Sequence, residues 1–309
     1  MGSLFAGLLA ECRESVTLIG TRADHLAAIA RSGLRLQTDA GDRQVPLATA
    51  SPAQVAAGVP ACPDVLMVWT KSGQTRAALE GVRTLIGAHT HLLSLQNGLG
   101  SAEVLGEFAP RTRVIVGVTN VPADRLGAGH VGSHGSGFLR MMSADGRDHD
   151  VLQRTATALQ RAGLACEIDP EIDVAIWEKV AFNTAMNALC AVSGARVGEI
   201  AAHDPARELA FTVAAEAVAV ARAAGVAAQL PRVHAAMRHG MAHHAQHQPS
   251  MLQDVLAHRP TEIDAINGAV VVAADRLGVA VPHTRTLLTL VQVIDRRHAS
   301  ERADRTQGG

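Results

Sequence analysis

One predicted helix carries three polar side chains with the potential for chemistry in otherwise apolar surroundings. Lys179, Asn183 and Asn187 follow one another at intervals of four residues within the segment IWEKVAFNTAMN (176–187). Residues four apart in an α-helix lie on the same face, so the ammonium and the two amides form one polar stripe. Burying such groups without partners is costly, which indicates that they bind something. The alternatives are an ion pair between Lys179 and the adjacent Glu178, and asparagines that only cap or crosslink helices.

Lysine is rare in this chain, and its rarity singles out two positions. The 28 lysines and arginines include only two lysines, Lys71 and Lys179. An ammonium can release its proton, whereas a guanidinium stays protonated. We therefore expect the lysines to be retained for chemistry that arginine does not perform, the alternative being chance retention of two surface residues.

Two further polar positions follow predicted strands. The apolar run VLMVW (65–69) leads into Thr70 and Lys71, and HLLSL (91–95) leads into the glycine-flanked turn that contains Asn97. Ligands in open α/β sheets lie at the carboxyl ends of the strands, and glycines let backbone amides approach a ligand. Both turns are therefore candidate binding segments.

The second half of the chain adds candidates with simpler explanations. Ser250 follows a proline at the start of an apolar run, which predicts a helix N-cap. Glu262 stands in the first turn of the next predicted helix, where the helix dipole favours an acid. His239 and His243 share one helical face, but no carboxylate or cysteine joins them at zinc-enzyme spacing. We predict an exposed helix there and no metal.

Composition narrows the class of partner. The 309 residues carry a net charge of -1 and only 2% aromatic residues, which offers no basic, stacking surface for nucleic acid and favours a small-molecule partner. The four cysteines have no C-x-x-C spacing, as is typical of reduced thiols, and no run reaches transmembrane length. We expect a cytoplasmic protein that does not bind membranes and acts as a monomer or homodimer.

Strand and helix patterns predict two domains. The predicted strands are 16–20, 65–69, 91–95, 114–118 and 165–169, with shorter extended pieces at 129–135 and 137–142 and helices at 23–31, 72–87, 102–107 and 149–162. Such alternation predicts a parallel sheet covered by helices. Long Ala-rich helical patterns follow at 171–191, 205–224, 231–247, 261–277 and 284–298. We predict a Rossmann-type α/β domain at 1–169 and an all-α domain at 170–309.

The first residues predict a dinucleotide-binding fold that lacks its start. Such folds begin with a buried strand, a G-x-G-x-x-G loop and a helix whose N-terminus holds the pyrophosphate. The segment 1–11 has the spacing of that helix and Gly2 the place of the last glycine, so we expect roughly ten residues of strand and loop to be missing. The alternative is a plain N-terminal helix. After the next predicted strand, Arg22 favours the 2′-phosphate of NADP over NAD, because Asp24 falls on the following helix.

Six motifs, in their order and spacing, closely resemble those of the ketopantoate reductases, the 2-dehydropantoate 2-reductases. They are TKSGQT (70–75), LQNGLG (95–100), GHV (129–131), WEKVAFNTAMNAL (177–189), SMLQD (250–254) and TEIDAINGAVV (261–271). The resemblance covers essentially the whole chain. It implies an NADPH-binding Rossmann domain, a helical domain like that of 6-phosphogluconate dehydrogenase, and a substrate in the cleft between them.

The same resemblance implies roles for individual residues. Lys179 would be the catalytic acid. The implied ligands at the reacting end are Asn97 and Asn183, with Ser250 and Glu262 as further substrate contacts, and Asn187 is a further substrate candidate on the same stripe. Arg22 and Lys71 are the implied cofactor ligands, with Asn97 and the fingerprint position Gly2 as further cofactor candidates. Two positions depart from the family pattern, since Val197 and His247 stand where some members have asparagine. Substrate identity is therefore less firmly implied than the type of reaction.

The chemistry of 2-oxo acid reduction suits these residue types. Negative charge grows on the carbonyl oxygen as hydride reaches the carbon, and a lysine ammonium can neutralise and protonate it, an effect of roughly 100- to 10,000-fold. Ionised Glu262 only accepts hydrogen bonds, so it suits a substrate hydroxyl, such as the terminal alcohol of ketopantoate, or the ammonium of Lys179. We predict NADPH-dependent reduction of ketopantoate to pantoate in pantothenate biosynthesis. The alternatives are a related 2-oxo acid reductase and a non-catalytic NADP(H)-binding relative.

Overall fold

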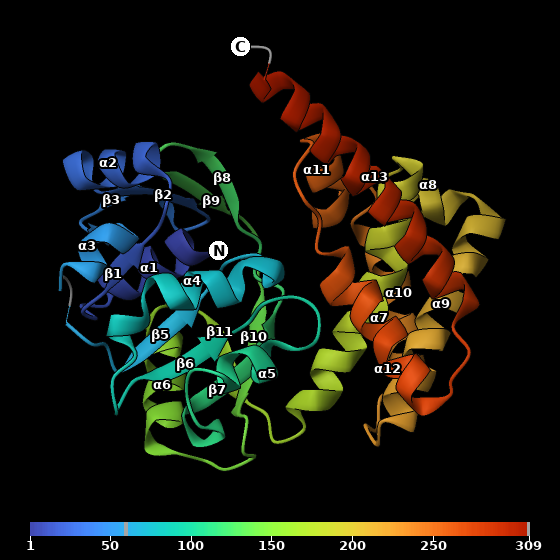
Figure 1. The fold of residues 1–309 in the computed structure, drawn as a ribbon, viewed down its shortest axis with the longest axis horizontal. Coiled ribbons are helices and arrows are strands. Elements are labelled where there is room, and N and C mark those ends of the chain that lie inside the picture. The colour runs from blue at the N-terminus through green and yellow to red at the C-terminus, as the bar shows by residue number, and fades with distance from the viewer. Residues whose placement is uncertain (59–60, 308–309) are drawn as a thin grey trace. The chain divides into compact units, whose positions relative to one another are not determined.

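The computed structural model describes residues 1–58 and 61–307, and the chain forms two compact units (Figure 1). Unit 1 comprises Met1–Gln96 and Ser101–Ile172, and unit 2 comprises Asn97–Gly100 and Asp173–Gly309. All strands of the described residues lie in unit 1, while unit 2 is helical apart from its loops. This is the fold class that the sequence predicted, an α/β domain of the Rossmann type followed by an all-α domain.

The central sheet of unit 1 has five strands in the order β11-β10-β7-β6-β5. The strands are β5 (Val65–Val68), β6 (His91–Ser94), β7 (Val114–Thr119), β10 (Phe138–Ser143) and β11 (Ala165–Ile168). Strands β5, β6 and β7 run parallel, as their continuous apolar runs predict, but β10 lies antiparallel to β7. All six residues of β7 are buried, as expected for the central strand of this sheet.

Two smaller sheets complete unit 1. β1 (Thr17–Ile19) pairs in parallel with β4 (Ala48–Ala50), separately from the five-stranded sheet. The other sheet has the order β3-β2-β9-β8, with β2 (Leu34–Thr38), β3 (Gly41–Val45), β8 (Asp124–Gly127) and β9 (His130–Ser133). Only the β9 region of this sheet was predicted from the sequence. β3 and β8 are rich in charged and polar residues, whereas the alternation of Leu34 and Leu36 in β2 is a strand signal that was overlooked.

Helices and turns connect these strands. They are α1 (Gly2–Glu11), α2 (Ala23–Ser32), α3 (Pro52–Ala56), α4 (Thr75–Gly81), α5 (Ser101–Gly106), α6 (Asp150–Arg161) and the 3₁₀ turns η1 (Ser72–Gln74), η2 (Arg83–Leu85) and η3 (Arg111–Arg113). The helix predicted for 72–87 is wrong as a single element, because it divides into η1, α4 and η2. Gly73 lies within η1 and Gly81 is the last residue of α4, consistent with the low helix propensity of glycine.

Unit 2 packs long helices around one apolar core. Its helices are α7 (Ile172–Ser193), α8 (Val197–Ala202), α9 (Asp204–Ala223), α10 (Leu230–His243), α11 (Ser250–Leu256), α12 (Ala269–Leu277) and α13 (Pro282–Gln307), with a π-helical turn η4 (Asp264–Gly268) before α12. The core is built mostly from alanine, valine, leucine and isoleucine side chains with four methionines, and all seven helices contribute to it. Figure 1 shows α7 lying among these helices, so its polar residues enter apolar surroundings.

Gly117 in β7 lies where its neighbours in the five-stranded sheet leave no room for a side chain. A Cβ at this position would lie 2.1 Å from the carbonyl oxygen of Arg140 and 2.7 Å from Cδ2 of Leu95. Gly117→Ala should therefore lower the stability of the fold by about 3 kcal/mol, measured as the shift of the thermal unfolding midpoint.

Gly106→Ala is the matched control, since a Cβ there meets nothing within 4 Å. Its effect should stay within about 1 kcal/mol. Equal midpoints for the two variants would contradict the close strand packing around Gly117.

Candidate active site

The polar stripe predicted from sequence exists on α7. This helix runs unbroken for 22 residues without an internal glycine or proline. Asn183 is 8% exposed and Asn187 is 5% exposed, while Lys179 retains partial exposure. No hydrogen bond to either asparagine side chain is found among the residues that the structure describes. Two nearly buried amides thus keep hydrogen-bonding capacity, which supports a binding function.

The electrostatic surroundings of Lys179 suit a proton donor. Burial lowers the pKa of the Lys179 ammonium from 10.5 to about 8, and the Glu262 carboxylate acts in the opposite direction. Although Lys179 as a whole is partly exposed, the desolvation of its ammonium is the larger cause. The adjacent Glu178 has other partners, because it accepts from the backbone N–H of Gln229 at 3.1 Å and lies 3.3 Å from Nε of Arg232.

The π-helical turn η4 connects Glu262 with α7. Nδ2 of Asn267, a fully buried residue of this turn, donates to the carbonyl oxygen of Thr184 at 3.0 Å. Thr184 directly follows Asn183 in α7. At the start of the turn, Oγ1 of Thr261 donates to Asp295 of α13 at 2.7 Å. The segment that carries Glu262 is therefore attached on both sides, and π-helical turns of this kind are frequent at functional sites.

The loop that carries Asn97 packs against the same turn. The backbone N–H of Leu99 donates to the carbonyl oxygen of Ala265 at 3.0 Å. Gly98 has φ +93°, and a Cβ there would lie 2.3 Å from that oxygen. Only glycine permits this approach. The structure thus brings the Asn97 loop, the turn after Glu262 and the α7 stripe together within unit 2.

The turns at the carboxyl ends of β5 and β6 are joined through Gln96. Its Nε2 donates to the carbonyl oxygen of Thr70 and to Oγ1 of Thr75, the latter at 2.8 Å, while its Oε1 accepts from Ser94 at 2.8 Å. Lys71 follows Thr70 in an extended conformation before η1. These bonds fix the residue that immediately precedes Asn97, and they hold the Lys71 turn at the carboxyl end of β5.

The cofactor candidates Gly2 and Arg22 both lie at helix N-termini in unit 1. Gly2 is the first residue of α1, and a Cβ there would come within 3.2 Å of the Trp69 ring at the end of β5. Arg22 immediately precedes α2, and its exposed guanidinium lies 3.5 Å from Asp24 in the first turn. The predicted placement of Asp24 on the helix is confirmed.

Ser250 differs from its predicted role as a helix cap. The helix α11 begins at Ser250, the preceding position belongs to Pro249, and no side chain makes a capping bond there. The N-cap prediction is wrong because proline already provides the extended conformation that precedes the helix. Ser250 remains exposed with its hydroxyl outside any cap.

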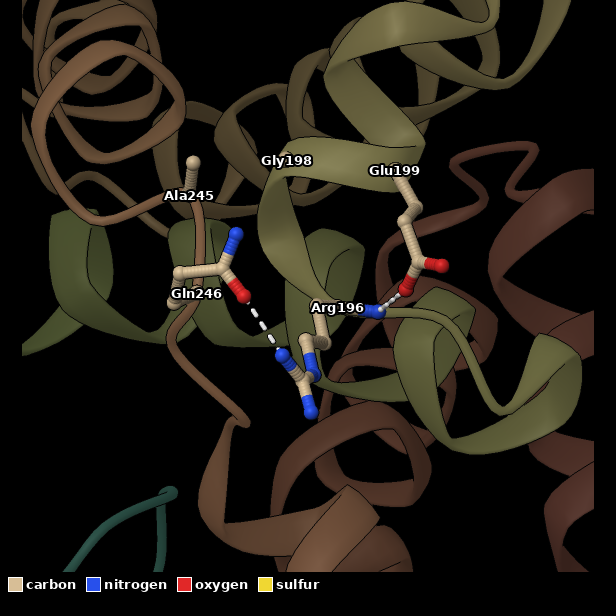
Figure 2. A pocket seen from close by; sticks show the side chains of 5 residues that line it. All are labelled: Arg196, Gly198, Glu199, Ala245 and Gln246. Carbon is tan, nitrogen blue, oxygen red and sulfur yellow. Dashed lines mark hydrogen bonds between the residues drawn. The ribbon is translucent and has the colours of Figure 1, made fainter.

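The two positions that depart from the family pattern are neighbours. The N–H of Val197 donates to the carbonyl oxygen of His247 at 3.2 Å, and the N–H of Gly198 donates to that of Ala245 at 2.9 Å. A hollow of about 290 Å³ lies beside this pairing. Figure 2 shows the residues that line it, Arg196, Gly198, Glu199, Ala245 and Gln246. Val197 is only 3% exposed, so its substitution changes packing at the start of α8.

The other predictions from composition concern cysteines and membrane spans. All four cysteines are free, and burial raises the pKa of Cys166 to about 11 and of Cys190 to about 12, which disfavours their reactive thiolates. None of the described helices has the length and apolar character that a bilayer crossing needs.

Comparison with known proteins places this chain in a family. The family model "Ketopantoate reductase PanE/ApbA" matches residues 1–146, and its C-terminal counterpart matches residues 171–295. A 2-dehydropantoate 2-reductase from Streptococcus pyogenes serotype M6 is 30% identical over 292 residues, 94% of each chain. The chain belongs to the ketopantoate reductase family. The sequence resemblance is therefore confirmed.

Solved structures agree with this membership. A PanE/ApbA family ketopantoate reductase from Ralstonia eutropha JMP134 superposes with a TM-score of 0.87 at 30% identity, covering 96% of this chain and 95% of that one. A D-mandelate dehydrogenase in a ternary structure with NADH and anilino(oxo)acetate gives a TM-score of 0.89 at 28% identity, covering 97% and 96%. This chain therefore shares its fold with a D-mandelate dehydrogenase as well as with ketopantoate reductases.

The Asn97 loop yields a prediction that needs no substrate. Gly98→Ala should detach the loop from η4, because the new Cβ meets the Ala265 carbonyl. The Leu99 amide should then lose its protection against hydrogen exchange, measured by exchange and mass spectrometry.

Gly100→Ala is the control, since Gly100 has a similar φ of +90° but a Cβ there meets nothing within 4 Å. Both variants carry the same backbone strain, so only the clash differs. Unchanged Leu99 protection in Gly98→Ala would contradict the described packing.

Proposed function

We propose that this chain reduces ketopantoate to pantoate with NADPH, as a step of pantothenate biosynthesis; its relatives carry the name 2-dehydropantoate 2-reductase. The observation that carries the proposal is the partly buried Lys179, with its pKa near 8 under the influence of Glu262, on one helix face with Asn183 and Asn187. Family membership supports the same reaction. Unit 1 would bind the cofactor, and unit 2 would supply the catalytic lysine.

In this mechanism Lys179 acts as general acid. NADPH, when bound, supplies the hydride that the carbonyl carbon of the 2-oxo acid accepts. The Lys179 ammonium neutralises the charge that develops on the carbonyl oxygen and then transfers a proton to it. A pKa near neutrality keeps the ammonium protonated below pH 8 while making the proton easier to give up than that of an ordinary lysine. Asn97 and Asn183 orient the carbonyl through their amides.

The remaining polar residues would bind the rest of the substrate. Ser250 has an exposed hydroxyl and can donate to the substrate carboxylate, as can the amide of Asn187. Glu262, when ionised, accepts from the terminal alcohol of ketopantoate while its charge supports the Lys179 ammonium. For the cofactor, Arg22 suits the 2′-phosphate, and Gly2, Lys71 and Asn97 would lie along the dinucleotide.

The direct test is the rate of NADPH oxidation with ketopantoate, compared with phenylglyoxylate, the 2-oxo acid related to mandelate. A higher kcat/KM for ketopantoate supports the proposal. No oxidation with either substrate, despite bound NADPH, would contradict it and favour a non-catalytic NADP(H)-binding relative.

A second candidate function is the reduction of a different 2-oxo acid. The observation that favours it is the structural similarity to D-mandelate dehydrogenase, together with Val197 and His247 at positions where some family members have asparagine. The same general acid serves both substrates, since the chemistry at the carbonyl is identical. A higher kcat/KM for phenylglyoxylate would decide for this candidate.

The cellular setting is a separate proposal that rests on composition. We propose that the enzyme is cytoplasmic and acts as a monomer or homodimer on a small molecule, without nucleic acid or membrane, and that its reaction uses no metal.

The pH dependence of kcat/KM should report Lys179. The protonated form is active, so kcat/KM for reduction should fall as pH rises through about 8. Glu262→Gln removes the charge that raises this pKa, so the fall should begin at lower pH. Asp264→Asn, which removes an exposed charge two residues away, is the control, and its kcat/KM should fall at the same pH as in the wild type. If kcat/KM of Glu262→Gln also falls at the wild-type pH, Glu262 does not influence the proton on Lys179.

Arg22 should decide the choice of cofactor. Arg22→Ala removes a charged hydrogen bond to the 2′-phosphate, so KM for NADPH should rise about tenfold or more, while KM for NADH changes little. Arg31→Ala, in the last turn of the same helix, is the matched control. Equal effects of Arg22→Ala on both cofactors would contradict the assignment.

A further inference from the structure

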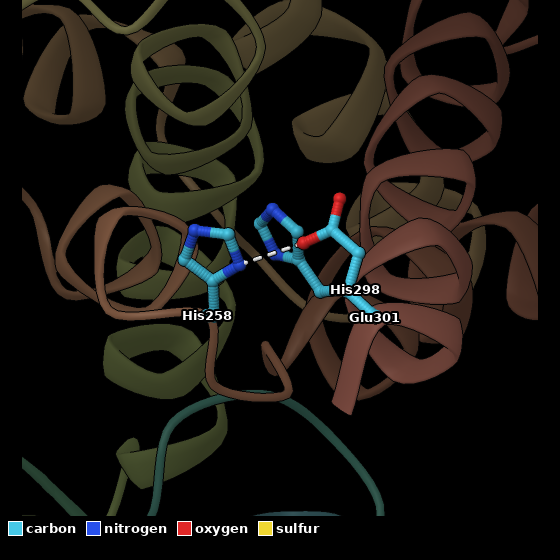
Figure 3. A group of neighbouring side chains, drawn as sticks. All are labelled: His258, His298 and Glu301. Atoms are coloured by element: carbon cyan, nitrogen blue, oxygen red, sulfur yellow. Dashed lines mark ion pairs between the residues drawn. The ribbon is translucent and has the colours of Figure 1, made fainter. Parts of the chain in front are cut away.

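A second cluster of ionisable side chains lies between the end of α11 and the last part of α13. His258, His298 and Glu301 each offer one ligand atom, and these atoms all lie within 4.8 Å of one another. Nδ1 of His258 is 3.0 Å from Oε2 of Glu301, and the two imidazole centroids are 4.1 Å apart. Figure 3 shows the His258 ring and the Glu301 carboxylate facing each other with the His298 ring beside them.

His298 has a buried nitrogen that the protein does not satisfy. The residue is 3% exposed, and its Nδ1 is buried without a hydrogen-bond partner among the described residues. Such an atom costs free energy and calls for a binding partner. Burial also lowers the pKa of the His298 ring, which favours the neutral form that ligates metals.

His258 is held in a backbone conformation that usually requires glycine. Its φ is +50°, directly after α11, where its N–H donates to Val255 at 3.0 Å. Glycine is preferred at this position because a Cβ is disfavoured there. Arg302 of α13 donates to the carbonyl oxygen of His258 and holds the residue in place. A strained histidine directed at another histidine and a carboxylate suggests that its side chain is needed.

We propose that His258, His298 and Glu301 bind a divalent transition-metal ion, with Zn²⁺ as the best match. Two imidazoles and one carboxylate are a common ligand set for zinc, with water in the fourth position. His298 and Glu301 stand three residues apart on one face of α13. The side chains of His258 and Glu301 are 45% and 39% exposed, so both can adjust to shorter metal–ligand distances.

The surrounding charges set the expected strength of the site. Arg297 lies 3.8 Å from the other carboxylate oxygen of Glu301, and Arg302 is bonded to His258. Both arginines repel a bound cation, so we expect Zn²⁺ to bind more weakly here than at a cysteine-ligated zinc site. The ion would attach the segment after α11 to α13, close to Thr261 and to Glu262 at the proposed active site. Binding of the ion itself does not depend on the proposed function.

The test is calorimetric titration of the full chain with Zn²⁺ after dialysis against EDTA. Wild-type protein should bind one ion specifically, and His298→Ala or Glu301→Gln should weaken this binding about tenfold or more. The control is His243→Ala, which breaks the stacked His239–His243 pair on α10, whose ring centroids are 4.6 Å apart. It should leave the binding unchanged.

Two outcomes would overturn the proposal. One is the absence of specific binding, and the other is equal weakening by His243→Ala and Glu301→Gln, which would mean adventitious binding to surface histidines. Because His298→Ala removes a buried side chain, folding is checked separately with Glu301→Gln. Zn²⁺ should raise the thermal unfolding midpoint of the wild type but not that of Glu301→Gln.

Discussion

The site depends on one electrostatic balance, that between the desolvated Lys179 ammonium and the Glu262 carboxylate. Burial alone favours the neutral amine, and the carboxylate partly restores the charged form, so the pKa remains near 8. A lysine in water would keep its proton to a higher pH, and a buried lysine without the carboxylate would lose its proton at a lower pH. The position of Glu262 relative to α7 therefore influences the pKa of Lys179, on which the proposed general-acid role depends.

The turn η4 maintains that position. A regular helix from residue 261 would pair each carbonyl within the helix, whereas the π-helical turn lets Ala265 accept from Leu99 and lets Asn267 reach Thr184. The carboxylate, the Asn97 loop and the α7 stripe are thus attached to a single turn. Asn267 is fully buried, and a buried polar side chain costs free energy unless it forms hydrogen bonds. The bond from Nδ2 of Asn267 to Thr184 offsets part of this cost and fixes the packing of η4 against α7.

The parts of this arrangement that follow from periodicity were predictable from the sequence. The spacing of Lys179, Asn183 and Asn187 predicted a common face, and apolar runs predicted β5, β6 and β7. The π-helical turn and the polar strand β3 were not predictable, because tertiary contacts stabilise them against weak local preference. The alternation of Leu34 and Leu36 in β2 was a strand signal that was overlooked. The His258 cluster was missed for a similar reason, since His258 stands 40 positions before His298 and 43 before Glu301 in the chain. Long-range contacts of this kind leave no spacing signal.

The most direct measurement is an NMR titration of the lysine ammonium groups after ¹³C-methylation. The chain contains only two lysines, so the Lys179 resonance can be assigned from its absence in Lys179→Met. This resonance should titrate with a pKa of about 8. A value near the ordinary 10.5 would show a solvated lysine and contradict the proposed general acid.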